Sequence, residues 1–137
     1  MEKIKVICDT EVIIDYLDHR QVRHLSTKHF IDNEIGLDFV ALSAITKMEL
    51  MAGVSNKEAL AKLNKNINRF NILLINPEIT SIALQLIESF KLSHNLAIPD
   101  SLIAATTLYT GFKLFTFNVK DFKFIPDLQL YQGIGQK

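Results

Sequence analysis

Short apolar runs alternate with segments of helical periodicity along this chain. The runs predicted as strands are residues 3–8, 38–43, 71–75 and 112–117, with a shorter one at 128–131. No Asn-Gly or Asp-Gly pair, the strongest short signal for a tight hairpin, occurs in the sequence. Strands separated by helices are joined by crossovers, which favours a parallel sheet covered on both faces. We therefore predict an α/β fold: a three-layer α/β/α sandwich with a mainly parallel sheet of four to five strands.

The segments between these strands carry apolar residues at helical spacing. After Pro77 the apolar positions follow the i, i+3, i+4, i+7 pattern of a helix that rests on a core. Gly53 and Gly111 are placed to end the helices before them. The helices predicted in this way are residues 10–17, 21–35, 43–53, 57–70, 77–90 and 99–111.

Composition limits the size and the class of the protein. With 137 residues, 48% of them hydrophobic, we expect residues 1–137 to form a single domain with its own core. Lysine plus arginine equals aspartate plus glutamate, so the net charge is zero. This balance argues against nucleic-acid binding by overall charge, although it leaves room for a local basic patch.

The sequence also bears on the compartment. A single cysteine, Cys8, excludes an intrachain disulfide, and its place in an apolar run predicts a buried core residue. Asp9 interrupts the first apolar run too early for a secretory signal, and no run approaches the ~20 apolar residues of a membrane span. We expect a soluble protein of the cytoplasm that does not associate with membranes.

Four polar residues stand at the boundaries of the predicted elements. Asp9 directly follows the first strand, and Asn118 follows the strand at 112–117. In open parallel sheets, ligands bind beyond the carboxyl ends of the strands, so both residues are predicted at that edge. Asp100 begins a helix that is small or apolar on nearly every side, which would point its first turn at the same edge.

Glu49 completes this set from a different helix. It lies four residues after Ile45, which we expect to form a buried stripe with Met48 and Ala52, so Glu49 is predicted at the margin of that stripe. A carboxylate there is costly unless something compensates it. Each residue also has a simpler interpretation: an N-cap for Asp9, a first-turn acid for Asp100 and a solvent-exposed side chain for Glu49.

The combination favours a cation site over separate structural roles. Two carboxylates about 4 Å apart repel by roughly 4 kcal/mol at an effective dielectric near 20, so a cluster of three acids requires a neutralising ion. Oxygen ligands without a convincing histidine or cysteine suit Mg²⁺ or Mn²⁺ rather than zinc. Such ions stabilise phosphoryl charge and activate a bound water.

Three stretches carry a resemblance to a known family: VIIDYL after the Asp-Thr pair, SAITKMELMAG, and IPDSLIAATTLYTGFKLFTFNVKDF at residues 98–122. In this order and spacing they resemble the PIN-domain family, and within it the VapC-type ribonuclease toxins of toxin–antitoxin pairs. The resemblance implies an RNA-cleaving hydrolase that uses Mg²⁺ or Mn²⁺ and a metal-activated water. It also implies a homodimer and a cognate antitoxin that inserts a segment into the groove of the active site.

The same resemblance implies roles for individual residues. It assigns Asp9, Glu49 and Asp100 as metal-binding and catalytic acids, with Asn118 at the fourth position and Asp121 as a further candidate metal ligand. Residues expected to contact the substrate are Thr10, Thr46 and Lys120.

Two departures from the family pattern keep other functions open. Glu11 stands where relatives usually carry a small polar residue, and Asn118 stands where many carry aspartate. A non-catalytic PIN-like module that binds RNA or protein is therefore an alternative. A phosphatase with an aspartyl nucleophile is another, since such enzymes usually need a second acid two residues later, where Glu11 lies.

Overall fold

The computed structural model describes residues 5–132. Four strands form one sheet in the order β3-β2-β1-β4, and every neighbouring pair is parallel. The strands are β1 (Val6–Cys8), β2 (Val40–Ser43), β3 (Asn71–Leu73) and β4 (Lys113–Phe115). The α-helices are α1 (Thr10–Leu17), α2 (His24–His29), α3 (Ala44–Ala52), α4 (Lys57–Ile67), α5 (Pro77–His94) and α6 (Ile98–Thr110).

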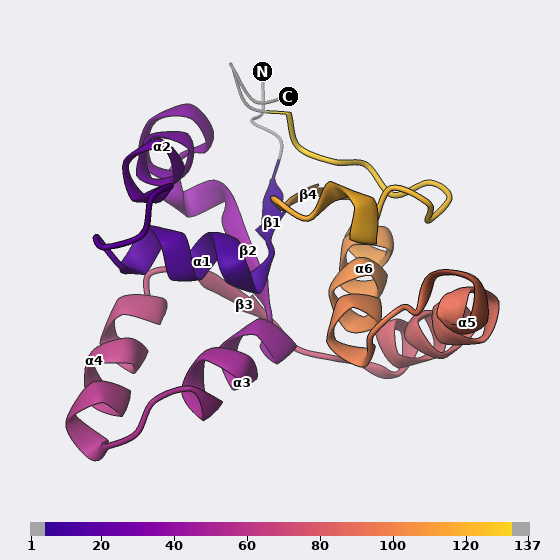
Figure 1. The fold of residues 1–137 in the computed structure, drawn as a ribbon, viewed down its shortest axis with the longest axis horizontal. Helices are drawn as coiled ribbons and strands as arrows, with labels where there is room; N and C mark the ends of the chain where they lie inside the picture. Colours follow the sequence, from indigo (N-terminus) through magenta and orange to yellow (C-terminus); the bar gives the residue numbers. More distant parts are fainter. Residues whose placement is uncertain (1–4, 133–137) are drawn as a thin grey trace.

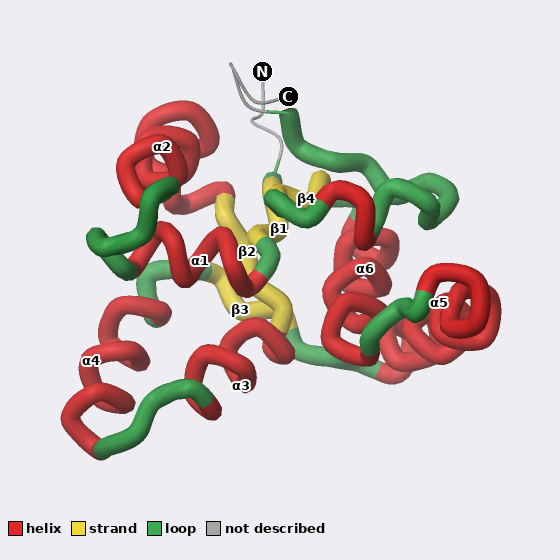
Figure 2. Tube along the Cα trace, in the orientation of Figure 1, coloured by secondary structure: helices red, strands yellow, loops and turns green. Residues whose placement is uncertain are grey.

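The helices cover the two faces of the sheet, as predicted (Figure 1). Figure 2 shows the strands between a group formed by α1, α2 and α4 and a group formed by α5 and α6. Side chains alternate along β1: Val6 and Cys8 pack in one buried cluster with α1 and Phe30, and Ile7 packs in the other with α6. This alternation is the period-two pattern of a strand buried on both faces. The three-layer α/β/α sandwich is confirmed.

The register of β1 and β4 places two chain segments side by side at the carboxyl edge of the sheet. Cys8 pairs with Phe115, and the backbone N–H of Asp9 donates to the carbonyl of Phe115 at 2.9 Å. The residues that follow, Asp9 and Thr116, therefore leave the sheet as neighbours. Cys8 is fully buried, which confirms the prediction of a core residue, and burial raises the pKa of its thiol far above the usual range.

Local signals in the sequence set most helix ends. The side chains of Asn56 and Asn76 accept from the backbone N–H groups three residues later, at 2.8 and 2.7 Å, and so cap α4 and α5. Gly111 ends α6 with a φ of 73°, a left-handed conformation that glycine adopts without a Cβ penalty. These ends agree with the predicted boundaries because capping depends on neighbours in sequence.

Two predicted elements differ in the structure. The run at 128–131 forms only an isolated parallel bridge between Leu130 and Leu114, so the described sheet has four strands, within the predicted four to five. The helix predicted at 21–35 is the short α2 followed by a π-helical stretch, η1 (Phe30–Ile35). Residues 3 and 4 of the first predicted strand lie outside the described residues.

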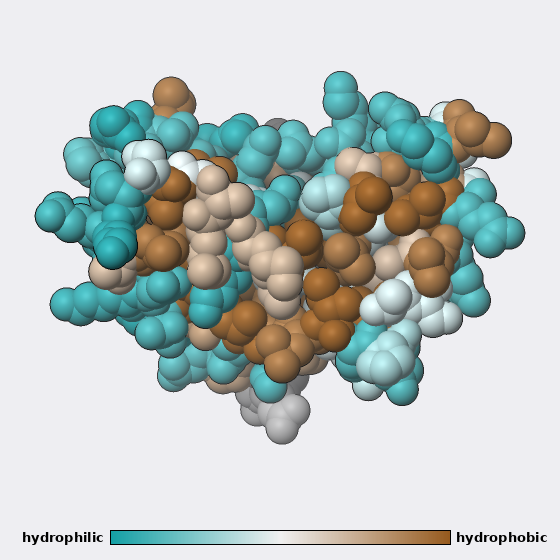
Figure 3. Space-filling view, turned by 90° about the horizontal axis from the view of Figure 1, so that it is seen from below, coloured by the Kyte–Doolittle hydropathy of each residue, from teal (hydrophilic) through white to brown (hydrophobic). Residues whose placement is uncertain are grey.

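The surface of the described residues includes an apolar face. Figure 3, seen from below the view of Figure 1, shows hydrophobic side chains across the middle of that face, where α3, α5 and α6 lie. Exposed apolar residues on these elements or beside them include Met48, Leu74 and Ile98, at 55%, 75% and 66% exposure. In the part of the chain that the structure describes, no helix has both the length and the apolar character needed to cross a bilayer.

Candidate functional site

A pocket of about 960 Å³ opens at the carboxyl edge of the sheet. It lies beyond the ends of β1 and β4 and continues between α1, α3 and α4. One end of the pocket is acidic, and the acids come from distant parts of the chain. The residues at this end are Asp9, Thr10, Glu11, Glu49, Asp100, Asn118 and Asp121. The structure therefore brings together all five residues for which the sequence suggested a cation-binding role.

Asp9 is the most constrained residue of this group. The residue is buried, with 5% of its surface exposed, and both carboxylate oxygens accept hydrogen bonds. Oδ1 accepts from the backbone N–H of Thr10 at 2.8 Å, and Oδ2 accepts from the hydroxyl of Thr116 at 2.8 Å. Asp9 is thus the N-cap of α1, and it also faces the pocket. Asp9 therefore has both positions that the sequence suggested, at the N-cap of α1 and in the lining of the pocket.

The electrostatics of Asp9 reflect this position. Burial raises the pKa of the Asp9 carboxyl, and the negative charges of Glu11 and Glu49 raise it further. The hydrogen bonds from Thr116 and Thr10 act in the opposite direction, because they stabilise the ionised form. Asp9 is therefore buried and close to other acids, and two hydrogen bonds hold its carboxylate in place. A nearby cation would stabilise its negative charge.

Glu49 is held in the pocket by a short chain of hydroxyl groups. The hydroxyl of Thr10 lies 2.7 Å from Glu49 Oε1 and 3.0 Å from the hydroxyl of Thr46. A carboxylate can only accept, so the single hydroxyl proton of Thr10 goes to Glu49, and Thr46 donates to Thr10. The chain Thr46–Thr10–Glu49 therefore fixes the direction of a glutamate at the surface.

The helical-wheel prediction for Glu49 is wrong. Met48 and Ala52 are exposed, and the fully buried residues of α3 are Ala44 and Thr46. Glu49 lies on an exposed face that borders the pocket rather than at the margin of a core stripe. The apolar residues of α3 that pack against the core are Ile45 and Leu50, so the wheel, which grouped Ile45 with Met48 and Ala52, assigned the wrong face.

Asp100 enters the pocket from the first turn of α6. Burial raises the pKa of its carboxyl to about 6, and the nearby charges of Asp9, Asp121, Glu49 and Glu11 add to the rise. Asp100 is also the first-turn acid that the helix dipole favours. Its charge is nevertheless disfavoured, because the repulsion from four neighbouring acids acts in addition to the loss of hydration.

Asn118 and Glu11 face each other across the pocket rim. The side-chain amide Nδ2 of Asn118 donates to Glu11 Oε2 at 3.0 Å. The backbone N–H of Asn118 donates to the hydroxyl of Thr116 at 3.0 Å, and that hydroxyl in turn donates to Asp9. The segment after β4 is therefore tied to both acids at the start of α1.

Two residues expected to contact substrate are placed differently. Thr46 is fully buried and is not among the residues that line the pocket, so its position is that of a support for Thr10. Lys120 is exposed on the short helix η3 (Val119–Asp121) and is likewise not part of the pocket lining. Thr10 lines the pocket.

Sequence reasoning missed Thr116 and Lys62. Thr116 is 2% exposed and connects Asp9 to Asn118, but a threonine after a strand carries no signal by itself. Lys62 lines the other end of the pocket from α4, and its place on the exposed face of an amphipathic helix looks like that of any solvated lysine.

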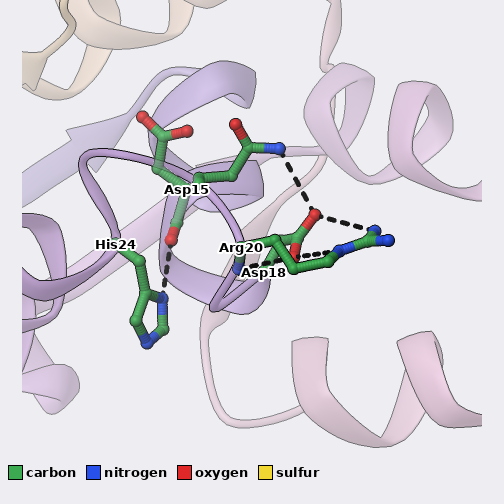
Figure 4. Close-up of polar contacts among 5 residues, drawn as sticks. Asp15, Asp18, Arg20 and His24 are labelled. Carbon is green, nitrogen blue, oxygen red and sulfur yellow. Dashed lines mark hydrogen bonds and ion pairs between the residues drawn. The ribbon is translucent and has the colours of Figure 1, made fainter.

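The end of the pocket away from the acids carries mixed charge. Figure 4 shows Asp18 accepting from Arg20 and from a neighbouring glutamine just after α1. Arg20 Nε lies 3.0 Å from Asp18 Oδ1, and this pairing holds the pKa of the Asp18 carboxyl well below its usual range. The same view shows His24 bonded to the backbone carbonyl of Asp15. Lys62 has no ion-pair partner in the described part of the chain, so its charge remains available to a ligand.

The donor set at the acidic end fits a hard divalent cation. Its side-chain donors are carboxylate, amide and hydroxyl oxygens, which Mg²⁺ and Mn²⁺ prefer. As the side chains lie, no group of three or more His, Cys, Asp or Glu residues among those described is arranged to hold one ion. The fit therefore rests on the chemistry of the donors, and on the burial and the mutual repulsion that together raise the pKa values of Asp9 and Asp100.

Comparisons with known proteins agree with this architecture. The ribonuclease VapC19 of Mycobacterium tuberculosis is 31% identical to this chain over 124 residues, which cover 90% of this chain and 96% of that protein. The ribonuclease VapC1 of Methanocaldococcus jannaschii is 28% identical over 131 residues, 94% of this chain and 87% of the relative.

Solved structures give the same result. A toxin–antitoxin complex from Klebsiella pneumoniae contains a chain that matches with a TM-score of 0.72 and 28% identity, over 94% of this chain and 100% of that one. VapBC-1 from nontypeable Haemophilus influenzae matches with a TM-score of 0.73 and 26% identity, over 94% and 98%. The PIN domain family itself matches residues 6–127, a range that contains every residue of the acidic pocket, and the chain therefore belongs to the PIN-domain family.

Proposed function

We propose that this protein is a metal-dependent endoribonuclease that hydrolyses RNA phosphodiester bonds, and that it acts as the toxin of a toxin–antitoxin pair in the cytoplasm. One observation carries the proposal: Asp9, Glu49 and Asp100, separated by 40 residues or more in sequence, line the same pocket. The names of the relatives, both ribonucleases, support it. Membership of the PIN-domain family favours this reaction over that of an aspartyl phosphatase.

Each acid has its own part in the proposed site. Asp9, fixed by Thr10 and Thr116, is the rigid ligand, and Glu49 and Asp100 approach from α3 and α6. Asn118 and Asp121 are the further candidates at the exit of β4. A bound Mg²⁺ or Mn²⁺ would neutralise these charges, lower the pKa of a coordinated water and stabilise the phosphoryl group under attack.

The shape of the pocket suggests where RNA binds. From the acids, the pocket continues along α1 to Lys62 and Asn66 on α4. We propose that a nucleic-acid strand follows this pocket, with its reacting phosphate at the acids and another phosphate near Lys62. Phosphate contacts of this kind supply much of the affinity of such complexes. Thr10, the expected substrate-side residue that lines the pocket, lies at the acidic end beside Asp9 and Glu49.

The direct test is cleavage of end-labelled RNA by the purified full chain. We expect cleavage with Mn²⁺ or Mg²⁺ and none in excess EDTA. Asp9→Asn, Glu49→Gln and Asp100→Asn should each abolish it, and Glu78→Gln, at the exposed first turn of α5, should not. If Asp9→Asn and Asp100→Asn cleave as fast as the wild type, the mechanism is wrong. RNA binding without cleavage at millimolar Mn²⁺ would instead identify a non-catalytic binding module.

We further propose that the protein binds a cognate antitoxin. The support is structural: the chains it matches include members of toxin–antitoxin and VapBC complexes. Co-expression with the protein of a small neighbouring reading frame, followed by co-purification and loss of RNA cleavage, would test this. A neighbouring protein that neither binds nor inhibits the chain would contradict it.

Pairing of the chain into a homodimer is the last element of the proposal. The apolar face in Figure 3 and the exposure of Leu74 and Ile98 supply surface for such contact. Light scattering after size exclusion should give twice the 15.6 kDa mass of the chain, and Leu74→Glu should shift that mass toward the monomer. A monomer at micromolar concentration for the unchanged protein would contradict dimerisation.

A further inference from the structure

The first turn of α1 carries an acid, Glu11, that lies outside the set of ligands proposed for the metal. Glu11 is exposed, lines the acidic end of the pocket, and accepts a hydrogen bond from the side chain of Asn118 at 3.0 Å. The two residues are 107 positions apart, so this contact exists only because the fold brings the exit of β4 to the start of α1. Glu11 is also close enough for its charge to act on both Asp9 and Asp100.

We propose that Glu11 is a further carboxylate ligand of the metal site, beside Asp9, Glu49 and Asp100, and that Asn118 is the residue that positions it. The inference rests on the proposed function, since it assigns one more ligand to the same cation. In this arrangement Asn118 contributes no negative charge. Its amide instead holds the carboxylate of Glu11 at the rim of the pocket.

The hydrogen-bond chemistry of the pair supports this division of roles. An ionised carboxylate offers about four lone-pair sites on two oxygens, and the amide of Asn118 uses one site on Oε2 of Glu11. No other hydrogen-bond donor to Glu11 is present among the described residues, so Oε1 remains available to a cation. Asn118 is itself fixed through its backbone N–H by Thr116. Glu11 thus belongs to the same hydrogen-bonded network as Asp9.

Glu11 has a competing structural explanation, because an acid in the first turn of a helix is favoured by the helix dipole. The chain offers a matched control for that effect. Glu78 occupies the corresponding second position of α5, is exposed, and lies away from the pocket. A helix-dipole role predicts the same consequence for Glu11→Gln and Glu78→Gln. A metal role predicts different consequences.

The test measures the affinity of the full chain for Mn²⁺ alone, by isothermal titration calorimetry and by the Mn²⁺ electron paramagnetic resonance signal. We expect Glu11→Gln to weaken Mn²⁺ binding about tenfold or more, the scale found when a supporting group of a metal site is lost. Glu78→Gln should leave the affinity unchanged. Both variants should keep the circular dichroism spectrum of the wild type, since both side chains are exposed.

A charge exchange across the pair gives a second, independent readout. In the double variant Glu11→Gln with Asn118→Asp, the new glutamine can donate to the new aspartate, so the carboxylate moves to the other side of the same hydrogen bond. We expect Mn²⁺ affinity to return toward the wild-type value. Recovery would show that a carboxylate on either side of this hydrogen bond supports Mn²⁺ binding.

The possible failures are distinguishable. Wild-type protein that binds no Mn²⁺ at millimolar concentration would overturn both the proposed function and this inference. If the wild type binds Mn²⁺ and Asp9→Asn does not, but Glu11→Gln binds as tightly as Glu78→Gln, the metal site stands and the role of Glu11 is refuted. Weakened binding in Glu11→Gln without recovery in the charge-exchanged double variant would refute the pairing with Asn118.

Discussion

The hydroxyl of Thr116 donates to Asp9 Oδ2 at 2.8 Å while it accepts the backbone N–H of Asn118 at 3.0 Å. Both Asp9 and Thr116 are buried, with 5% and 2% exposure. Since β1 and β4 pair in register through Cys8 and Phe115, this contact follows directly from the sheet. One buried hydroxyl group thus joins the central acid of the pocket to the segment that carries Asn118.

Replacing this hydroxyl should therefore weaken the site without changing the fold. Thr116→Val keeps the shape of the side chain but leaves a buried carboxylate oxygen and a backbone N–H without a partner, a cost of about 1–3 kcal/mol. We expect a lower unfolding temperature and weaker Mn²⁺ binding. Thr116→Ser, which retains the hydroxyl, should restore the Mn²⁺ affinity. Equal affinities in the valine and serine variants would show that the hydroxyl does not position Asp9.

A second prediction concerns the stability of the metal-free protein. The pKa of Asp100 is about 6 in the folded state, compared with 3.8 for an aspartate without such interactions. The folded protein therefore holds this proton more tightly than the unfolded chain does. The contribution of Asp100 to stability should then fall as pH rises from about 4 to 6, because the folded state resists ionisation of this carboxyl, and it should be level above that range.

Removing the charge of Asp100 should reverse this loss. Two pKa units correspond to roughly 3 kcal/mol, and partial exposure reduces the expected gain for Asp100→Asn to about 1 kcal/mol at pH 7.5. The gain should become small near pH 3, below both pKa values, where the carboxyl is mostly protonated in the folded and in the unfolded state. Thermal unfolding in EDTA at these two pH values measures it. A variant that is less stable than the wild type at pH 7.5 would show that Asp100 is not under electrostatic strain.

The third prediction addresses RNA binding along α4. Lys62 lines the pocket, whereas Lys65 is exposed on the same helix and does not. We expect Lys62→Gln to weaken RNA binding in Ca²⁺ or without metal and to reduce the salt dependence of log K by about 0.7, the value for one phosphate contact on a single strand. Lys65→Gln, with the same loss of charge, should change neither quantity. Identical effects of the two variants would indicate nonspecific attraction.

The fourth prediction separates support from substrate contact at Thr46. Its buried hydroxyl donates to Thr10, which donates to Glu49. Thr46→Val should lower kcat for RNA cleavage and leave KM nearly unchanged, because the variant loosens Glu49 and touches no substrate. Thr46→Ser should retain most of the activity. A change confined to KM would instead assign Thr46 to the substrate, as the sequence alone suggested.

Much of this site could be predicted from sequence because its information is local. The alternation of strand and helix patterns predicts the layers, and acids placed after strands or at helix starts are predicted at the carboxyl edge. Capping by Asn56 and Asn76 and the stop at Gly111 depend on residues three or four positions away. These features predict that Asp9 and Asp100 are neighbours.

The remaining features depend on tertiary structure, because they require contacts between residues that are remote along the chain. The register of β1 against β4 decides that Thr116 meets Asp9, and the packing of α1 against the exit of β4 decides that Glu11 meets Asn118. The exposed position of Glu49 also depends on tertiary packing, since α3 packs against the core through Ile45 and Leu50. Periodicity shows which residues share a face of one element, but only the packed fold determines which faces meet.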